Sequence, residues 1–294
     1  MKEAATDSTL CDAYQQLFGI DIRQCAHFGI LERTTAILEM DYEEIHLTTN
    51  SPKTYALIVE GIRPSLKVAI RKELTGIDGR SGCFYIFFSP LEFQQLFDNG
   101  SVFYSVHCAA GRLVYSRPDF RLPSATWELV RSRFLKAFPQ FNSSHQRSRA
   151  FLDGAKFYIG TDQVEMAAFM LHQSLELMFT GMEIMLLAKP KKSHKIGSHF
   201  KLSGMIAPTL CGCFGERDSL SSILPGIERA YLNVRYKSSF HISGEEVDLL
   251  ITKTENAQHE ARRLVLVYGN LLFPDLSAAP LPDFRKPCPG YAGD

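Results

Sequence analysis

The segment A-F-M-L-H-Q-S-L-E-L at residues 168–177 decides the fold of this chain. Methionines recur around it, from Met166 to Met185, at three- and four-residue multiples, which predicts a helix with one face in a bundle core. Gln173 and Glu176 interrupt the apolar residues and predict a buried polar pair. About sixty residues later the chain reads A-Y-L-N-V-R-Y at 230–236, followed by His241. These two segments predict helices of one domain.

The second half of the chain is helical in its periodicity almost throughout. The last helix begins with S-G-E-E, in which Ser243 caps the helix and Glu246 completes a capping box. Helices of this length in succession predict an up-and-down bundle over residues 148–273. We expect the helices at 148–160, 162–188, 220–236 and 244–270.

The first half alternates strand and helix patterns, which predicts a small mixed α/β domain over residues 1–122. The fold class is therefore α+β. Ser124 begins a further helix that Pro139 ends, and a polar linker at 138–147 precedes the bundle, so residues 123–147 are helix and linker. A Pro-rich tail follows at 274–294. The first domain has predicted helices at 28–40, 65–74 and 91–97, and strands at 43–49, 54–60, 83–88 and 113–115.

Composition restricts the function classes. The chain has 32 basic and 32 acidic residues, so any nucleic-acid contact must come from a local cluster of charge. No apolar run reaches the ~18 residues that span a bilayer, so we expect no membrane segment. Seven cysteines, an odd number without a signal peptide, favour free thiols and a cytoplasmic protein.

The helical half resembles the HEPN family, the higher-eukaryote and prokaryote nucleotide-binding domains, over about 125 residues. The resemblance rests on A-F-L-D-G-A-K-F-Y at 150–158, the H-Q-S-L-E helix, His194 after a Pro-Lys-Lys loop, and A-Y-L-N-V-R-Y. This family contains metal-independent ribonucleases, some of them toxins of toxin–antitoxin or defence systems, and plain binding modules. It implies a homodimer through the bundle, and neither cofactor nor metal.

Ribonucleases of the family share an Arg, four to six residues, and a His, and here Arg235 and His241 enclose five residues. An imidazole moves the proton of a ribose 2′-hydroxyl while a guanidinium stabilises the phosphate, so this pair is the candidate catalytic site. Tyr236 stands where the nucleases of the family typically have a polar residue, which favours a structural Arg235 paired with Glu176 or another acid. His194 is interpreted as a capping or packing residue.

The stretch at 189–201 contains five lysines, two histidines and no acid. Lysines neutralise phosphates, so Lys191, Lys192 and Lys195, with Lys237 further on, are candidate ligands of a nucleotide or RNA. The alternative is a solvated loop whose lysines serve solubility.

The first half weakly resembles the minimal nucleotidyltransferases that accompany HEPN domains. Thr48–Ser51 stands in place of their Gly-Ser, and Thr54–Ala56 in place of their paired aspartates, so we expect an inactive remnant. The leading hypothesis for the whole chain is a nucleotide- or RNA-binding module without turnover. The alternatives are a metal-independent endoribonuclease, which uses Arg235 and His241, and a structural or regulatory homodimeric partner.

Overall fold

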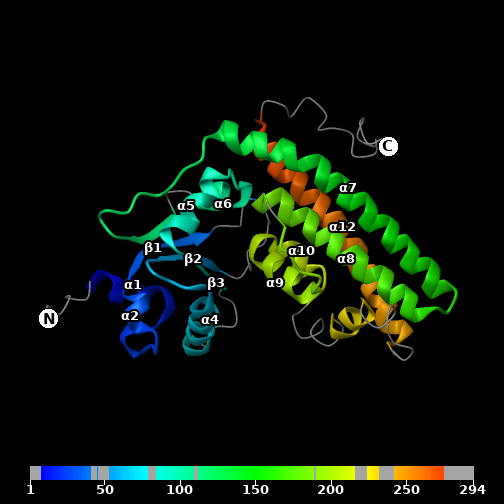
Figure 1. The fold of residues 1–294 in the computed structure, drawn as a ribbon, viewed down its shortest axis with the longest axis horizontal. Coiled ribbons are helices and arrows are strands. Elements are labelled where there is room, and N and C mark those ends of the chain that lie inside the picture. Colours follow the sequence, from blue (N-terminus) through cyan, green and yellow to red (C-terminus); the bar gives the residue numbers. More distant parts are fainter. Residues whose placement is uncertain are drawn as a thin grey trace. The chain divides into compact units, whose positions relative to one another are not determined.

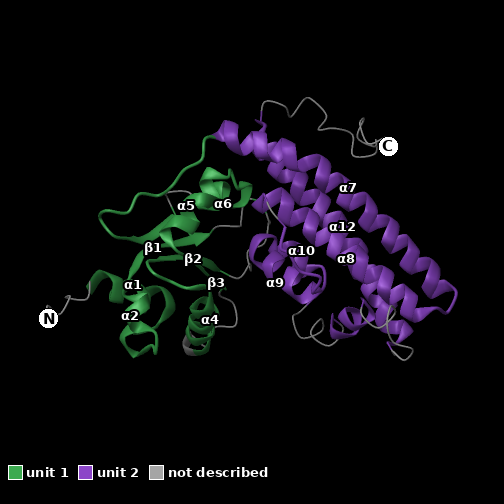
Figure 2. Cartoon of the chain, in the orientation of Figure 1, with its two compact units in different colours: residues 1–126 green, residues 127–294 purple. Residues whose placement is uncertain are grey.

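The computed structural model describes residues 8–40, 45, 53–78, 84–108, 112–188, 190–215, 224–231 and 242–274. The chain divides into two compact units, residues 1–126 and 127–294 (Figure 2). The fold class is α+β, as predicted: the first unit contains a small mixed sheet with helices, and the second is a helical bundle (Figure 1). Among the described residues, no helix combines the length and the hydropathy that crossing a membrane requires.

The first unit is built on a four-stranded sheet of order β3-β2-β1-β4. β1 pairs antiparallel with both β2 and β4, whereas β2 and β3 are parallel. The strands are β1 (Thr34–Met40), β2 (Thr54–Val59), β3 (Phe84–Phe88) and β4 (Leu113–Ser116). The helices are α1 (Ser8–Phe18), the 3₁₀ turn η1 (Ile22–Gln24), α2 (Phe28–Leu31), α4 (Pro64–Asp78), α5 (Pro90–Asp98) and α6 (Val102–His107).

Most of the elements predicted for this unit are confirmed. The strands expected at 54–60, 83–88 and 113–115 are β2, β3 and β4, and the helices expected at 65–74 and 91–97 are α4 and α5. The strand predicted at 43–49 lies outside the described residues, apart from Ile45.

The helix predicted at 28–40 is wrong. The helix there, α2, ends at Leu31, and β1 begins at Thr34. β1 lies between β2 and β4, so both of its backbone edges are hydrogen-bonded and nearly all of its side chains are buried. Thr34, Thr35 and Ile37 are β-branched and suit such a strand. The apolar residues of a short buried segment fit both the helical and the strand period, and here the contacts within the sheet outweigh the helical spacing.

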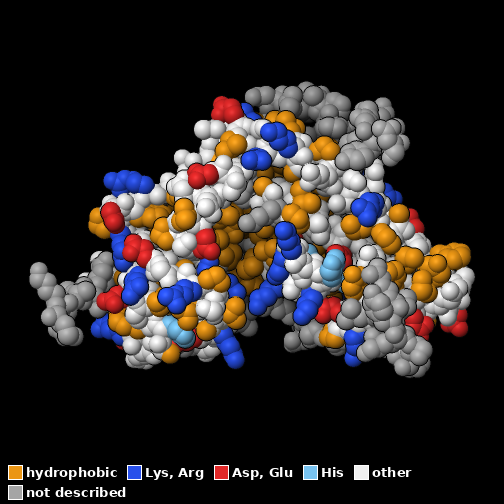
Figure 3. Space-filling view, viewed as in Figure 1, with side chains coloured by type: hydrophobic (Ala, Val, Ile, Leu, Met, Phe, Trp, Pro, Cys, Tyr) orange, Lys and Arg blue, Asp and Glu red, His pale blue; other side chains and the backbone are white. Residues whose placement is uncertain are grey.

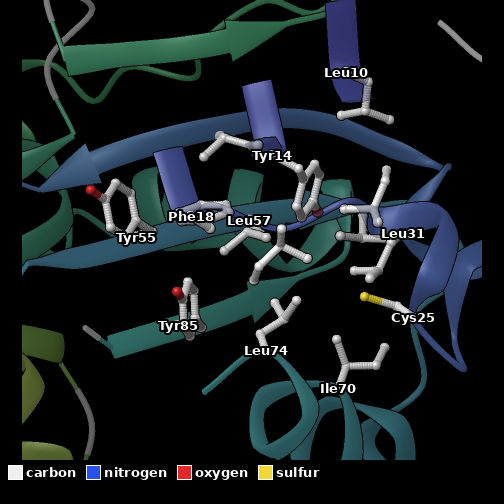
Figure 4. Packing of buried hydrophobic residues seen from close by; sticks show 14 of the residues in the cluster. Leu10, Tyr14, Phe18, Cys25, Leu31, Tyr55, Leu57, Ile70, Leu74 and Tyr85 are labelled. Atoms are coloured by element: carbon white, nitrogen blue, oxygen red, sulfur yellow. The ribbon is translucent and has the colours of Figure 1, made fainter. Parts of the chain in front are cut away.

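Aromatic side chains form the centre of the first unit (Figure 4). Phe18 of α1 packs edge-on against Tyr55 of β2 and Tyr85 of β3, at ring-centroid distances of 4.9 and 5.2 Å. Tyr14 is fully buried, and its hydroxyl oxygen lies 3.0 Å from the Thr34 hydroxyl oxygen. Burial raises the pKa of Tyr14 strongly. The β2 residues expected in place of catalytic aspartates therefore belong to the packed interior.

The second unit consists of long helices that run side by side (Figure 1). They are α7 (Trp127–Gly160), α8 (Val164–Leu187) and α12 (Gly244–Leu272), with α9 (Ile196–Ile206), α10 (Pro208–Gly212) and a helical stretch at 224–231 beside them. The helices predicted at 162–188 and 244–270 are confirmed as α8 and α12, and 148–160 is the second part of α7. Ser243 and Glu246 form the predicted capping box. Of the helix predicted at 220–236, only 224–231 is described.

A buried hydrogen-bond network joins the three long helices. The hydroxyls of Ser148 and Ser174 each donate to the other residue's carbonyl oxygen, at 2.7 and 2.8 Å. The side-chain amide of Gln258 donates to both serine hydroxyl oxygens, at 2.8 and 3.1 Å. These contacts bind α7, α8 and α12 to one another at a defined level along the bundle, because buried polar groups require their specific partners.

The linker predicted at 138–147 is wrong, because α7 runs through it without interruption. A proline inside a helix removes the hydrogen bond to the carbonyl four residues earlier, here that of Leu135. Pro139 is exposed and Leu135 is 53% exposed, so this turn of the helix has its proline on the solvent side. Phe134, Phe138 and Phe141 are buried on the other side of the same turns and hold the helix together. The units consequently divide between residues 126 and 127.

Candidate functional site

The predicted lysine ligands lie in the loop between α8 and α9. Lys191, Lys192 and Lys195 are all exposed within residues 190–195, which we call the lysine loop. Arg235, Lys237 and His241 lie outside the described residues, so their predicted roles remain predictions. The site described below is therefore the lysine loop with the parts of α8, α9 and 224–231 around it.

A buried ion pair holds the lysine loop in place. Glu183 of α8 and His199 of α9 have fully buried side chains, and Glu183 Oε1 lies 2.8 Å from His199 Nδ1. The other carboxylate oxygen of Glu183 accepts a hydrogen bond from the Lys191 backbone N–H at 2.6 Å. The second ring nitrogen of His199, Nε2, lies 2.7 Å from the Ser193 carbonyl oxygen. Both ends of the pair thus bind backbone groups of the loop.

The partners of His199 determine its charge. A carboxylate and a carbonyl oxygen accept hydrogen bonds and cannot donate them, so both ring nitrogens must carry protons. Burial by itself lowers the pKa of His199, but the hydrogen bonds to Glu183 and to the Ser193 carbonyl, with the charges of Glu183 and Glu176, outweigh burial and raise it. His199 is therefore an imidazolium whose positive charge is balanced by Glu183.

Next to the lysine loop, two histidine rings stack on Tyr231, which ends the described part of the 224–231 helix. The rings of His172 and His194 lie nearly parallel to the Tyr231 ring, with centroids 4.7 and 5.5 Å away and an interplanar angle of 19° in each case. His194 Nδ1 lies 2.8 Å from Glu176 Oε1, so the carboxylate orients the imidazole. The side chain of His194 is 69% exposed, whereas that of Glu176 is 19% exposed. The stack thus has one solvent-facing ring.

His172 differs from His199 in its protonation. Its Nε2 lies 3.0 Å from the His194 carbonyl oxygen and must donate to it. Its Nδ1 lies 3.2 Å from the Gln173 side-chain amide nitrogen, and a neutral Nδ1 accepts that hydrogen bond. Burial lowers the pKa of His172 despite the opposing influence of Glu176. A neutral, buried His172 is a flat surface for Tyr231 and fixes the backbone of the lysine loop at His194.

The 224–231 helix is also tied to the start of α9. Glu228 Oε1 accepts a hydrogen bond from the Gly197 backbone N–H at 2.8 Å. Carboxylates at a helix N-terminus are favourable because the first N–H groups have no partner inside the helix. On the face shown in Figure 3, lysine and arginine side chains gather beside a histidine over the region of α9 and α10. The structure therefore combines exposed cations with a stacking surface on a rigid support.

The structure corrects two sequence predictions at this site. Gln173 and Glu176 do not form a buried pair, because both are half-buried and the fully buried polar residues of that turn are His172 and Ser174. His194 does not cap α9, whose N-cap is Lys195 without a side-chain hydrogen bond. Packing, the other role expected for His194, is seen in its stacking on Tyr231.

The sequence reasoning missed the roles of Glu183 and His199. A signal was present, because Glu183 interrupts an otherwise apolar helix seven residues after Glu176, on nearly the same helix face. Acids on the apolar face of a helix are rarely buried without a partner, and the nearby histidines were candidates for that partner. Among the described residues, no group of three or more His, Cys, Asp or Glu side chains is arranged to hold a metal ion.

One family model matches the chain, and it lies in the helical unit. The model described as the HEPN domain covers residues 142–264, from the middle of α7 to α12. No curated protein matches the chain. The helical unit is thus similar to the HEPN domain over the region that contains α8, the lysine loop, the stacked rings and the Glu183–His199 pair.

Proposed function

We propose that the helical unit binds RNA or a nucleotide through the lysine loop and the stacked rings, and that it does so without turnover. The observation that carries the proposal is the Glu183–His199 pair, which uses two fully buried charges to hold a loop of exposed lysines. Burying an ion pair gives little net stability. The effect of the pair on the conformation of the loop therefore explains its presence better than a gain in stability does. Similarity to the HEPN domain supports the same class of ligand.

The chemistry of the loop suits phosphates and bases. Lys191, Lys192 and Lys195 are exposed ammonium groups, and such groups release counterions when they bind phosphates. The exposed His194 ring, supported by Tyr231 beneath it, offers a base a flat surface. Stacking of a base on such a ring contributes about 1–3 kcal/mol in proteins that bind single strands.

The proposal assigns no catalysis to the first unit. Thr54, Tyr55 and Ala56 of β2 are buried, with exposed fractions of 1%, 3% and 0%. Phosphoryl transfer by two metal ions needs carboxylates that reach the ions, and hydroxyl and methyl groups inside a sheet do not supply them. We propose that this unit is an inactive, nucleotidyltransferase-like remnant.

The test is binding of a labelled single-stranded RNA and of labelled nucleotides, followed by fluorescence anisotropy. Wild-type protein should bind, and K191Q/K192Q/K195Q should bind at least tenfold more weakly. The matched control is R133Q/K136Q/R147Q, which removes three exposed cations from α7 and should retain affinity. Absence of binding by the wild type at millimolar ligand would refute the proposal, as would equal losses of affinity in the two triple variants.

A second variant set separates stacking from charge. His194→Phe keeps a ring on Tyr231, whereas His194→Ala removes it. We expect the Ala variant to lose about 1–3 kcal/mol of binding free energy for RNA, and the Phe variant to lose less. Equal affinities of the two variants would show that the ring contributes no stacking.

A metal-independent endoribonuclease is the second candidate, favoured by the geometry of His194. Glu176 holds Nδ1, and Nε2 of the exposed ring has no hydrogen-bond partner in the described part of the chain. Such a nitrogen accepts the proton of a ribose 2′-hydroxyl while the 2′-oxygen attacks phosphorus. The P–O5′ bond breaks as the 2′-O–P bond forms, and the leaving 5′-oxygen takes a proton from solvent water. Cleavage of an RNA pool in EDTA by the wild type, lost in His241→Ala or His194→Ala, would favour this candidate.

We also propose that the protein is a homodimer through the bundle, as the family resemblance implies. Analytical ultracentrifugation at micromolar concentration gives the mass directly. A monomer at all accessible concentrations would refute the dimer and would weaken the ribonuclease candidate, whose site is completed across the two-fold axis. The mass would leave the binding proposal unaffected, since all described elements of the lysine loop belong to one chain.

A further inference from the structure

The Glu183–His199 pair binds two backbone groups of the lysine loop. Glu183 accepts a hydrogen bond from the Lys191 N–H at 2.6 Å, and His199 Nε2 donates to the Ser193 carbonyl oxygen at 2.7 Å. Lys192 lies between these two attachment points in the sequence. The conformation of the exposed lysines therefore depends on contacts that end at one pair of buried charges.

The contact to Ser193 depends on the charge of His199. A neutral imidazole has only one N–H, whereas the two groups beside this ring, a carboxylate and a carbonyl oxygen, are both acceptors. The carboxylate is the stronger acceptor because it is charged, so the proton that remains stays on Nδ1. Nε2 then presents a lone pair to a carbonyl oxygen 2.7 Å away, and the two repel each other. Loss of one proton therefore releases the loop at Ser193.

Loss of that proton also changes the charge beneath the loop. With His199 protonated the pair is neutral, whereas with His199 neutral the Glu183 carboxylate has lost its cationic partner. Both side chains are fully buried, so solvent screens the remaining negative charge little. This charge repels phosphates that approach the lysines of the loop. A single proton thus controls both the geometry and the electrostatics of the proposed binding site.

The groups around His199 place the loss of its proton on the alkaline side. Burial lowers the pKa of His199, but the hydrogen bonds to Glu183 and the Ser193 carbonyl, with the charges of Glu183 and Glu176, outweigh burial and raise it above 6.5. Further titratable or charged side chains lie on the elements around α9. They are those of His172 on α8, of Lys191, Lys192, His194 and Lys195 in the lysine loop, of Glu228 and Arg229 in the 224–231 helix, of Cys211 on α10, and of Lys201 on α9 itself. The lysines and the arginine among them are exposed to solvent, which screens their charges, so the two acids on α8 prevail.

We propose that RNA binding at the lysine loop requires the proton of His199, so that the affinity for RNA falls as the pH rises above neutral. This inference rests on the proposed function of the lysine loop. Binding and protonation are reciprocal, because RNA favours the loop conformation that needs the proton and its phosphates favour the protonated pair. His199 is a positioning residue, which acts on the ligand through the backbone of Ser193.

The variant E183Q separates the proton from the hydrogen bonds. Its amide oxygen accepts from the Lys191 N–H, and its NH₂ group donates to Nδ1 of a neutral His199, whose Nε2 still donates to the Ser193 carbonyl. The loop keeps both contacts without an imidazolium, and the pair is uncharged, as it is in the protonated wild type. The affinity of this variant for RNA should therefore match that of the wild type at about pH 6.5 and should not depend on His199 at higher pH.

The experiment measures the affinity of the full chain for a labelled oligoadenylate by fluorescence anisotropy between about pH 6.5 and pH 9, below the range in which lysines lose their charge. The ratio of the wild-type affinity to the E183Q affinity cancels the titration of His194 and of the other groups that the two proteins share. This ratio should fall by about tenfold over the range, and tenfold per pH unit is the limit for one proton.

The control is E255Q, which removes a carboxylate from the exposed pair with Lys156 and should keep the wild-type pH profile. Circular dichroism verifies that each variant is folded. A second readout needs only the wild type, because saturating oligoadenylate should raise the pKa of His199 in an NMR titration. A constant ratio for E183Q, the same loss of pH dependence in E255Q, or a His199 pKa that RNA leaves unchanged would each overturn the inference.

These outcomes separate the inference from the function on which it rests. Wild-type protein that binds no RNA overturns both. RNA binding that is lost in K191Q/K192Q/K195Q, together with parallel pH profiles for the wild type and E183Q, supports the lysine loop as a binding site and overturns only the role of the proton.

Discussion

Glu183→Gln is the most direct test of the charged pair beneath the lysine loop. The substitution keeps the shape of the side chain but replaces one carboxylate oxygen with an NH₂ group. The amide oxygen still accepts from the Lys191 N–H, and the NH₂ group donates to His199 Nδ1 once that nitrogen is deprotonated. His199 then keeps a proton on Nε2 for the Ser193 carbonyl. All hydrogen bonds survive, and only the charges disappear.

The cost follows from the three hydrogen bonds that lose a charge, which are those of Glu183 to the Lys191 N–H, of Glu183 to His199, and of His199 to the Ser193 carbonyl. A hydrogen bond to a charged group contributes about 1.5–3 kcal/mol, and a neutral one about 0.5–1.5 kcal/mol. Three such changes lower the free energy of unfolding by about 3 kcal/mol in total at neutral pH. For a unit of this size, that corresponds to a fall in Tm of roughly 6–12 °C. The control is Glu255→Gln in the exposed Lys156 pair, which should cost less than about 1 kcal/mol.

The pH dependence gives the sharper criterion. The wild-type pKa of His199 is raised in the folded state, so its contribution is fully present below about pH 6.5 and is lost as pH rises through the folded pKa. In Glu183→Gln the carboxylate is gone and burial dominates, so the folded pKa falls below the unfolded value. That variant should therefore lose stability as pH drops below about 6.5.

The measurement is urea unfolding of both proteins by circular dichroism between about pH 5 and pH 8. The difference in unfolding free energy should grow as pH falls, by about 1.4 kcal/mol for each unit of pKa difference. Subtracting the unfolding free energy of one protein from that of the other cancels the contributions of the remaining histidines, which the two proteins share. A difference that is independent of pH would refute the assignment of His199 as an imidazolium.

Three further predictions concern other parts of the helical unit. Ser174→Ala removes hydrogen bonds to α7 and Gln258 and should lower the free energy of unfolding in urea by about 1–3 kcal/mol. Ser203→Ala should be neutral or stabilising, because the buried Ser203 hydroxyl has no hydrogen-bond partner among the described residues; similar losses in the two variants would contradict this. Ser243→Ala should cost about 1 kcal/mol and speed amide exchange in the first turn of α12, and unchanged exchange would count against the capping box. Because the pKa of His145 is lowered to about 4, its ring should stay neutral in an NMR titration down to about that pH. As the pH is lowered from about 6.5, the free energy of unfolding should therefore decrease, and this decrease should be absent in His145→Gln.

The periodic segments of the chain were predictable because their residues carry local signals. α8 and α12 follow from helical spacing, and the capping box at Ser243 sets the start of α12 within one residue. β2 and β3 follow from runs of branched and aromatic residues. The HEPN resemblance, read from short motifs, is matched by the family model over residues 142–264.

The errors occur where a local signal and a tertiary contact disagree. Pro139 signals a helix end, but buried phenylalanines before and after it keep α7 continuous, and the proline itself lies on the exposed side of the helix. Residues 34–40 match a helical spacing, but their position between two strands makes them β1. In both cases the energy that decides the structure comes from residues distant in sequence.

By itself, the sequence determined the α+β class, the positions of most strands and long helices, and the exposed lysines after α8, because these depend on patterns within a few residues of one another. The tertiary structure decided the site. His199 is charged and His172 neutral although both are buried histidines, because His199 forms hydrogen bonds to a carboxylate and a carbonyl, whereas His172 forms them with a carbonyl and an amide and its nearest carboxylate, that of Glu176, is 3.8 Å away. Protonation depends on which groups the fold brings within hydrogen-bonding distance, and no local pattern contains that information.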